Sequence, residues 1–99
     1  MRPTALGWID YDASTAPDWD RAHVRRLARR LGYRVVWPDE HSQLPVADQA
    51  READADVVIV PAPEHIEPLE LNRIMDIADV ETVFPRLSFA RWRVAGAVR

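Results

Sequence analysis

Three carboxylates and one histidine in this sequence have the chemistry to hold a metal ion. Asp10 and Asp12 follow an apolar run near the N-terminus, and Glu64 and His65 follow a later one. Oxygen ligands with one imidazole suit Mg²⁺ or Mn²⁺, which keep open positions for substrate phosphates. A metal-dependent phosphoryl-transfer or hydrolase activity is therefore one hypothesis. Acidic residues are also common where strands end in solvated turns, and this interpretation is preferred, with no metal and no cofactor expected.

The residue types that are missing exclude several other chemistries. The chain has no cysteine, which removes disulfides, thiolate metal sites and cysteine nucleophiles. All 13 basic residues are arginine, so there is no lysine to form a Schiff base or bind a nucleotide phosphate. The three glycines do not form a phosphate-binding loop, and no serine has the context of a hydrolase nucleophile.

A second group of residues has the character of a binding surface. Arginines recur at helical spacing opposite the apolar side of a predicted helix, and tryptophan and phenylalanine stand near arginines at two places in the chain. Tryptophan and arginine are enriched in binding hot spots. The candidate interface residues are Trp19, Arg21, Arg25, Arg26, Arg29, Arg30, Phe89 and Trp92. A solvated helix face is the alternative explanation for the arginines.

The elements that must position these residues alternate between strand and helix. Apolar runs predict strands over residues 4–11, 33–37, 56–61 and 80–84, and helical spacing predicts helices over residues 17–31, 46–53 and 69–78. This alternation is typical of an α/β fold with right-handed crossovers. We expect an open, mainly parallel sheet of four to five strands, flanked by helices in three Rossmann-like layers.

Parallel strands bring their carboxyl ends to one edge of a sheet, where functional crevices of open α/β folds lie. We expect Asp10, Asp12, Glu64 and His65 at this edge. Residues 1–85 are predicted to form the α/β domain. Residues 86–99, rich in arginine and aromatic residues, are predicted to dock on that domain or to serve as an interaction arm.

Charge is unevenly distributed along the chain. Residues 39–84 carry twelve acidic residues against two arginines, whereas the segments on either side have an excess of arginine, and the net charge is −3. An acidic chain repels phosphate overall, so a nucleic-acid adaptor using the helix arginines ranks below a protein partner or self-association. No apolar run approaches the roughly 20 residues of a membrane span, so a cytoplasmic protein without a membrane partner is expected.

Three segments resemble the N-terminal catalytic domain of serine recombinases of the resolvase/invertase family. They are ALGWIDYD at 5–12, RLARRLGY at 26–33, and ADVVIV at 55–60 followed by EHI at 64–66. The family begins with a strand of the form G-Y-x-R-x-S, continues with a helix ending in L-G-Y or similar, and carries D-R-L-x-R after its third strand. The resemblance spans about residues 4–84 and implies a resolvase-like fold.

At the positions of that family's catalytic residues, this chain has residues of other types. Trp8, Asp10 and Asp12 stand where the family has tyrosine, arginine and the nucleophilic serine, and Glu64, His65 and Pro68 where it has an aspartate and two arginines. An aspartate in place of an arginine reverses the field that stabilises a phosphate transition state, so no recombinase activity is expected. The resemblance therefore implies a catalytically inactive recombinase-like protein that acts as a protein-binding or regulatory module.

Overall fold

Four consecutive apolar residues form the centre of the sheet. β3 (Val57–Val60) has all four side chains buried, because it is flanked by strands and covered on both faces. In the computed structural model, which describes residues 2–39 and 41–92, β3 pairs in parallel with β1 (Thr4–Gly7) and with β4 (Asp79–Thr82). β2 (Arg34–Val36) pairs in parallel with β1, and β5 (Leu87–Phe89) is antiparallel to β4.

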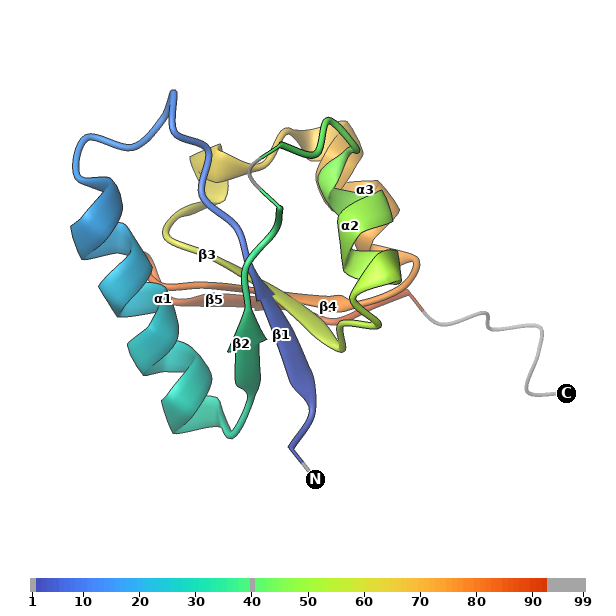
Figure 1. The fold of residues 1–99 in the computed structure, drawn as a ribbon. Coiled ribbons are helices and arrows are strands. Elements are labelled where there is room, and N and C mark those ends of the chain that lie inside the picture. Colours follow the sequence, from blue (N-terminus) through green and yellow to red (C-terminus); the bar gives the residue numbers. More distant parts are fainter. Residues whose placement is uncertain (1, 40, 93–99) are drawn as a thin grey trace, which may run out of the picture.

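The strand order is β2-β1-β3-β4-β5, with helices in two outer layers (Figure 1). α1 (Pro17–Leu31) covers one face of the sheet, and α2 (Val46–Glu52) and α3 (Pro68–Met75) lie together on the other. A short 3-10 helix, η1 (Pro63–His65), follows β3. The predicted fold class is confirmed: the chain forms an open, mainly parallel α/β sheet flanked by helices in three layers.

Helix α1 begins and ends at residues with clear helix signals. Pro17 stands in the first turn, where its missing N–H is not needed. Gly32 ends the helix in the left-handed conformation, with φ at 86°, which glycine adopts without strain. Its acidic first turn and basic last turn both suit the helix dipole. Neither α1 nor any other helix within the described ranges is long and apolar enough to cross a membrane.

Each face of the sheet has its own apolar core, because successive strand residues point to opposite faces. The core under α1 contains Ala5, Val24, Leu27, Ala28, Val57 and Ile59. The core under α2 and α3 contains Leu6, Val46, Ala47, Ala50, Ala55, Val58, Val60, Ile74, Met75, Ala78 and Val80. The sheet is thus held between two apolar layers, and loops at its two ends are left to form sites.

Most predicted bounds differ from the structure by one to three residues, and two larger differences concern the sheet. The first strand ends at Gly7 rather than at residue 11, although the backbone N–H of Trp8 still donates to the carbonyl of Ile59. The chain then turns at Asp10, whose carbonyl accepts hydrogen bonds from two N–H groups further along. β5 was not predicted as a strand: its three residues stand between Arg86 and Arg91 and do not belong to a longer apolar run, unlike the three residues of β2.

Candidate functional site

A pocket of about 460 Å³ opens at the carboxyl ends of β1, β2 and β3. Its walls are the loops after β1 and β2, the start of α2 and the segment from η1 to α3. Its size falls within the range of small-molecule sites. The lining includes Trp8, Asp10, Tyr11, Asp39, Gln49, His65, Glu67 and Glu70. The described lining contains carboxylates and no arginine, so the pocket is acidic.

His65 joins two of the loops at this edge. Its side chain is buried, and its Nδ1 accepts a hydrogen bond of 2.9 Å from the backbone N–H of Asp10. A nitrogen that accepts carries no proton, so the neutral ring has its proton on Nε2. The structure thus brings together two predicted site residues, Asp10 and His65, through the backbone of Asp10 and not through its carboxylate.

The carboxylates of this edge stabilise local backbone structure. Asp10 Oδ1 accepts a hydrogen bond of 3.0 Å from the N–H of Asp12, and Asp39 Oδ1 accepts one of 2.9 Å from the N–H two residues later. Glu70 Oε2 accepts from the N–H of Ala47 at 3.1 Å, in the first turn of α2. Such bonds stabilise turns and helix starts. They explain these acidic residues without a ligand.

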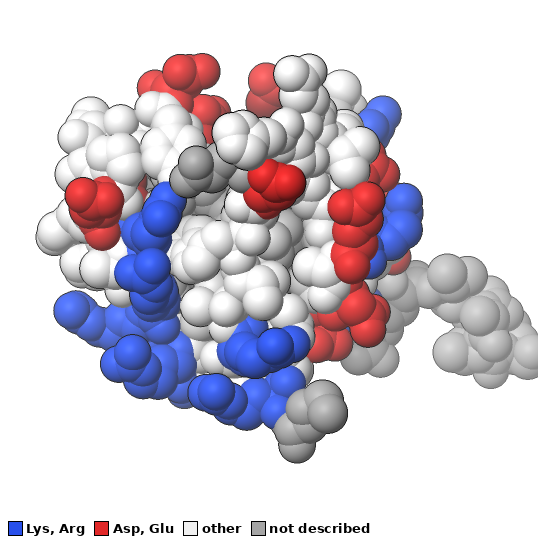
Figure 2. Space-filling view, viewed as in Figure 1, with Lys and Arg blue, Asp and Glu red and all other residues white. Residues whose placement is uncertain are grey.

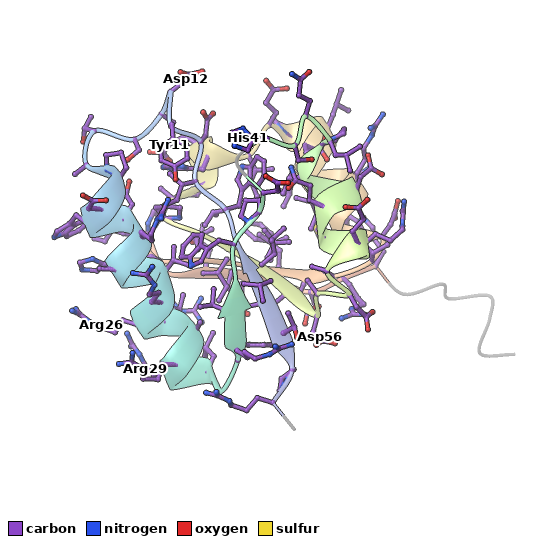
Figure 3. The ribbon with its side chains drawn as sticks, viewed as in Figure 1. Tyr11, Asp12, Arg26, Arg29, His41 and Asp56 are labelled. Atoms are coloured by element: carbon purple, nitrogen blue, oxygen red, sulfur yellow. The ribbon has the colours of Figure 1, made fainter. Side chains whose placement is uncertain are left out.

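The predicted metal ligands are not gathered around one point. Among residues 2–39 and 41–92, no group of three His, Asp or Glu side chains could hold a metal ion. Asp12 and Glu64 are exposed and do not line the carboxyl-edge pocket, and Asp12 lies at the outer end of its loop (Figure 3). The reason is that β1 ends at Gly7, so the turn at Asp10 carries Asp12 away from the pocket.

The second candidate site is the outer side of α1, where the predicted arginines lie. The α1 arginine surface consists of Arg21, Arg25, Arg26, Arg29 and Arg30, of which only Arg21 is half-buried. In Figure 2 the basic side chains gather at the lower left, over this helix. The ion pairs of the described chain involve Arg51, Arg86 and Arg91. Within that part of the molecule, no carboxylate neutralises the α1 arginines.

Trp37 supports one side of the α1 arginine surface. Its ring lies directly on Gly7, where an added Cβ would be 2.5 Å from the ring. The guanidinium carbons of Arg21 and Arg25 lie 5.1 and 5.6 Å from the ring centroid, within cation–π range. Arg21 also donates a hydrogen bond to the Tyr11 hydroxyl. Trp37 was not among the predicted interface residues; the signal for its position is a glycine inside an apolar strand, which marks a close approach of another group.

Trp19 lies near the N-terminal end of the same helix. Its side chain is 60% exposed, and its ring centroid is 3.7 Å from that of His23. Val83 and Phe84, which follow β4, line a shallow pocket with these two rings, and Phe84 is largely exposed. Asp20 and Glu64 also line this pocket, so a surface of mixed aromatic, apolar and acidic residues adjoins the α1 arginine surface.

Phe89 and Trp92, the other predicted interface residues, lie on the opposite side of the sheet. Phe89 packs against the core under α2 and α3. The indole N–H of Trp92 donates to the side-chain oxygen of Asn72 at 2.9 Å, and its backbone N–H donates to the carbonyl of Met75. The structure therefore separates both residues from the α1 arginine surface. Residues 93–99 of the predicted arm lie outside the described residues.

The α1-side face of β4 is polar. Asp79 and Glu81 project from it and alternate with buried neighbours along the strand. Burial raises the pKa of Tyr33 above its ordinary value of 10.0, and the carboxylates of Asp79, Glu81 and Asp56 raise it further, while Arg91 acts in the opposite direction. Tyr33 therefore stays protonated and neutral at physiological pH.

The two candidate sites differ in what they leave available for a ligand. Three of the four carboxylates in the described pocket lining, those of Asp10, Asp39 and Glu70, accept backbone hydrogen bonds, whereas the exposed arginines of α1 have no carboxylate partner in the described chain. No protein-family model matches this chain, and no match was found among curated proteins or solved structures. Fold and sites together define a small three-layer α/β domain with an acidic pocket and an arginine surface that forms no ion pair within residues 2–39 and 41–92.

Proposed function

We propose that this chain is a catalytically inactive, recombinase-like α/β protein that acts as a protein-binding or regulatory module. Its partner is a protein with an acidic surface, and the contact is the α1 arginine surface. The observation that carries the proposal is that these arginines have no ion-pair partner within the described residues. In a protein with a net charge of −3, such an unneutralised positive surface favours an acidic partner.

The chemistry of arginine fits carboxylates. A guanidinium group forms paired hydrogen bonds with a carboxylate and is more weakly hydrated than an ammonium group. Residues four apart on a helix are neighbours, so Arg25 and Arg29 form one row and Arg26 and Arg30 a second. The 15 residues of α1 span about 22 Å, which matches one acidic helix or strand of a partner. Trp19 adds an exposed aromatic ring, the other residue type enriched in hot spots.

A protein partner fits these charges better than a nucleic acid. Acidic side chains spread over the α2 and α3 side of the molecule (Figure 2), so a long phosphate chain that passes α1 is repelled there. Asp18 and Asp20 in the first turn also limit the length of the positive rows. The acidic patch of a folded protein is confined in size and avoids both sources of repulsion.

The residues of the carboxyl edge do not suit the cleavage of DNA. The resemblance to serine recombinases places Asp10 and Asp12 at the positions of the family's arginine and nucleophilic serine. The Asp10 carboxylate accepts a hydrogen bond from its own loop, and no arginine lines the adjoining pocket within the described chain. A phosphate at this edge would meet negative charge, which is the reverse of what its transition state requires.

The test compares two labelled probes on the full chain by fluorescence anisotropy: poly-glutamate, and duplex DNA of the same total charge. The test variant combines Arg26→Glu and Arg30→Glu. The matched control combines Arg51→Glu and Arg73→Glu, which make the same charge change at exposed positions of α2 and α3. Far-UV circular dichroism establishes that both variants are folded.

We expect saturable binding of poly-glutamate at about 50 mM salt, weakened by about tenfold or more in the α1 variant. The control variant should change the affinity by less than about twofold, because its charges lie off the contact surface. Equal weakening in both variants, or no saturable binding, would contradict the proposal. Tighter binding of the duplex than of poly-glutamate would assign the surface to nucleic acid instead.

A further inference from the structure

A small hollow lies at the edge of the sheet opposite the carboxyl-edge pocket. Its volume is about 250 Å³, and its walls come from the second half of α1, the start of β2 and the residue before Pro3. Arg2, Arg25, Arg29 and Arg34 line it, together with Tyr33, and no acidic residue is among its described lining. We call this hollow the arginine pocket. Its four arginines come from three separate segments of the chain.

Neutral groups hold two of these arginines. Arg34 Nη2 donates to the hydroxyl of Thr4 at 3.2 Å, and Arg25 lies over the ring of Trp37. In the described ranges none of the four arginines pairs with a carboxylate. Asp56 lies at the same edge, but its Oδ2 accepts from the N–H of Thr4 at 2.9 Å and it does not line the pocket. Four arginines are therefore concentrated at the pocket without an ion pair in the described residues, and the nearest carboxylates, which raise the pKa of Tyr33, lie outside its lining.

We propose that the arginine pocket binds a phosphate monoester, presented by a phosphorylated side chain of the acidic protein partner. This inference rests on the proposed function for the identity of the partner. A phosphate monoester carries about −1.5 to −2 charges at neutral pH and three strong acceptor oxygens. Several guanidinium groups around one hollow match such a group in charge and in hydrogen-bonding geometry. At about 250 Å³ the pocket is smaller than sites for whole drug-sized ligands, and it suits a single group.

A monoester fits better than the diester of a nucleic acid. A phosphate monoester is the terminal group of its side chain, so it can enter a concave site without further atoms that must leave on the other side. A backbone phosphodiester has one charge and continues in both directions, which would carry it along the acidic parts of the surface. A carboxylate also enters the pocket, but it brings one charge and two oxygens, so phosphorylation should strengthen binding.

The experiment follows the amide signals of the ¹⁵N-labelled full chain by NMR during titration with three probes. They are inorganic phosphate, an acidic peptide with one phosphoserine, and the same peptide with serine. The variants are Arg34→Gln and Arg29→Gln in the pocket. The matched control is Arg26→Gln, which removes the same charge from the outer side of α1, where Figure 3 labels Arg26. The quantity compared is the ratio of serine-peptide to phosphopeptide dissociation constants.

We expect saturable shifts with phosphate at the start of β2 and the end of α1. The ratio of dissociation constants should be about ten or more, and either pocket variant should bring it close to one. Arg26→Gln should weaken both peptides equally and leave the ratio unchanged. A ratio near one in the unmodified chain would overturn the proposal. So would a ratio that falls as much in Arg26→Gln as in the pocket variants, because the preference for phosphate would then come from the general positive charge of α1 and not from the pocket.

Failure of this inference is distinguishable from failure of the proposed function. Binding of poly-glutamate with a ratio near one would overturn the phosphate pocket and leave the proposed function standing. Phosphate binding that is lost in Arg34→Gln, with neither peptide bound, would support the pocket and overturn its protein partner. A further competitor is duplex DNA without terminal phosphates, added at the same total charge as the phosphopeptide, since it contains only phosphodiesters. If it displaces the phosphopeptide, the choice of a monoester is overturned.

Discussion

Replacing Gly7 with alanine should destabilise the chain, because the ring of Trp37 occupies the space that a Cβ needs. The new Cβ would lie 2.5 Å from Cζ3, 2.7 Å from Cη2 and 2.9 Å from Cε3 of that ring. Since tolerable contacts begin near 3.4 Å, the ring must move by about 0.9 Å. Arg21 and Arg25 lie over the ring, so the shift also disturbs the α1 arginine surface.

The size of the effect follows from two opposing terms. Overfilling a packed site costs about 1–3 kcal/mol, and replacing glycine with alanine in a strand regains about 0.5–1 kcal/mol of backbone entropy. The net loss should be about 1–2 kcal/mol of unfolding free energy. For a chain of this size that lowers the melting temperature by roughly 5–15 °C. Urea unfolding followed by far-UV circular dichroism measures the free energy directly.

A double-mutant cycle separates this contact from a general intolerance of Gly7 to substitution. In the background of Trp37→Ala the obstructing ring is absent, so Gly7→Ala should be neutral or slightly stabilising. The coupling energy between the two changes should then be about 1–2 kcal/mol or more. The reasoning is refuted if Gly7→Ala costs the same in both backgrounds, or if it stabilises the unmodified chain.

Three further predictions concern the other sites. The folded state raises the pKa of Tyr33, so the protonated tyrosine contributes fully to the free energy of unfolding below about pH 10, and this contribution is lost as the pH rises through the raised pKa. Urea unfolding across this range should show a decrease in the free energy of unfolding that is absent in Tyr33→Phe. His65→Leu removes the acceptor of the Asp10 N–H and should cost about 1–3 kcal/mol in urea unfolding, whereas a loss below about 0.5 kcal/mol would show that water replaces the ring. Addition of Mn²⁺ should cause no localised NMR broadening at the carboxyl edge, and saturable broadening there would revive the metal-dependent hypothesis.

The fold was predictable to the extent that local signals and burial patterns specify it. Helix α1 has a proline at its start, a glycine after its end and apolar residues on one side, and all three signals lie within the helix or next to it. β3 is a continuous apolar run, which is typical of a parallel strand covered on both faces. Once helices and strands alternate, crossover handedness limits the topology. These local features account for the agreement in fold class.

The sites were harder to predict because they depend on contacts between distant residues. The hydrogen bond from Asp10 to His65 joins positions 55 residues apart, and the contact of Gly7 with Trp37 also crosses from one strand to the next. A pattern within one segment contains no information on which partner lies opposite. The end of β1 is the same kind of case: the apolar run continues past Gly7, but the turn at Asp10 depends on hydrogen bonds beyond that run.

The arginine pocket is a consequence of parallel strand pairing combined with the position of arginines in the chain. β1 and β2 are parallel neighbours in which Thr4 pairs with Arg34, so both strands start at the same edge of the sheet. The helix that connects two parallel strands must return to that edge before the second strand begins. The last turns of α1, with Arg25 and Arg29, therefore arrive beside Arg2 and Arg34. α2 and α3 cross on the opposite face and carry their own acidic residues there (Figure 1). Asp56 does lie at this edge, but among the described residues no carboxylate forms an ion pair with the arginines of the pocket.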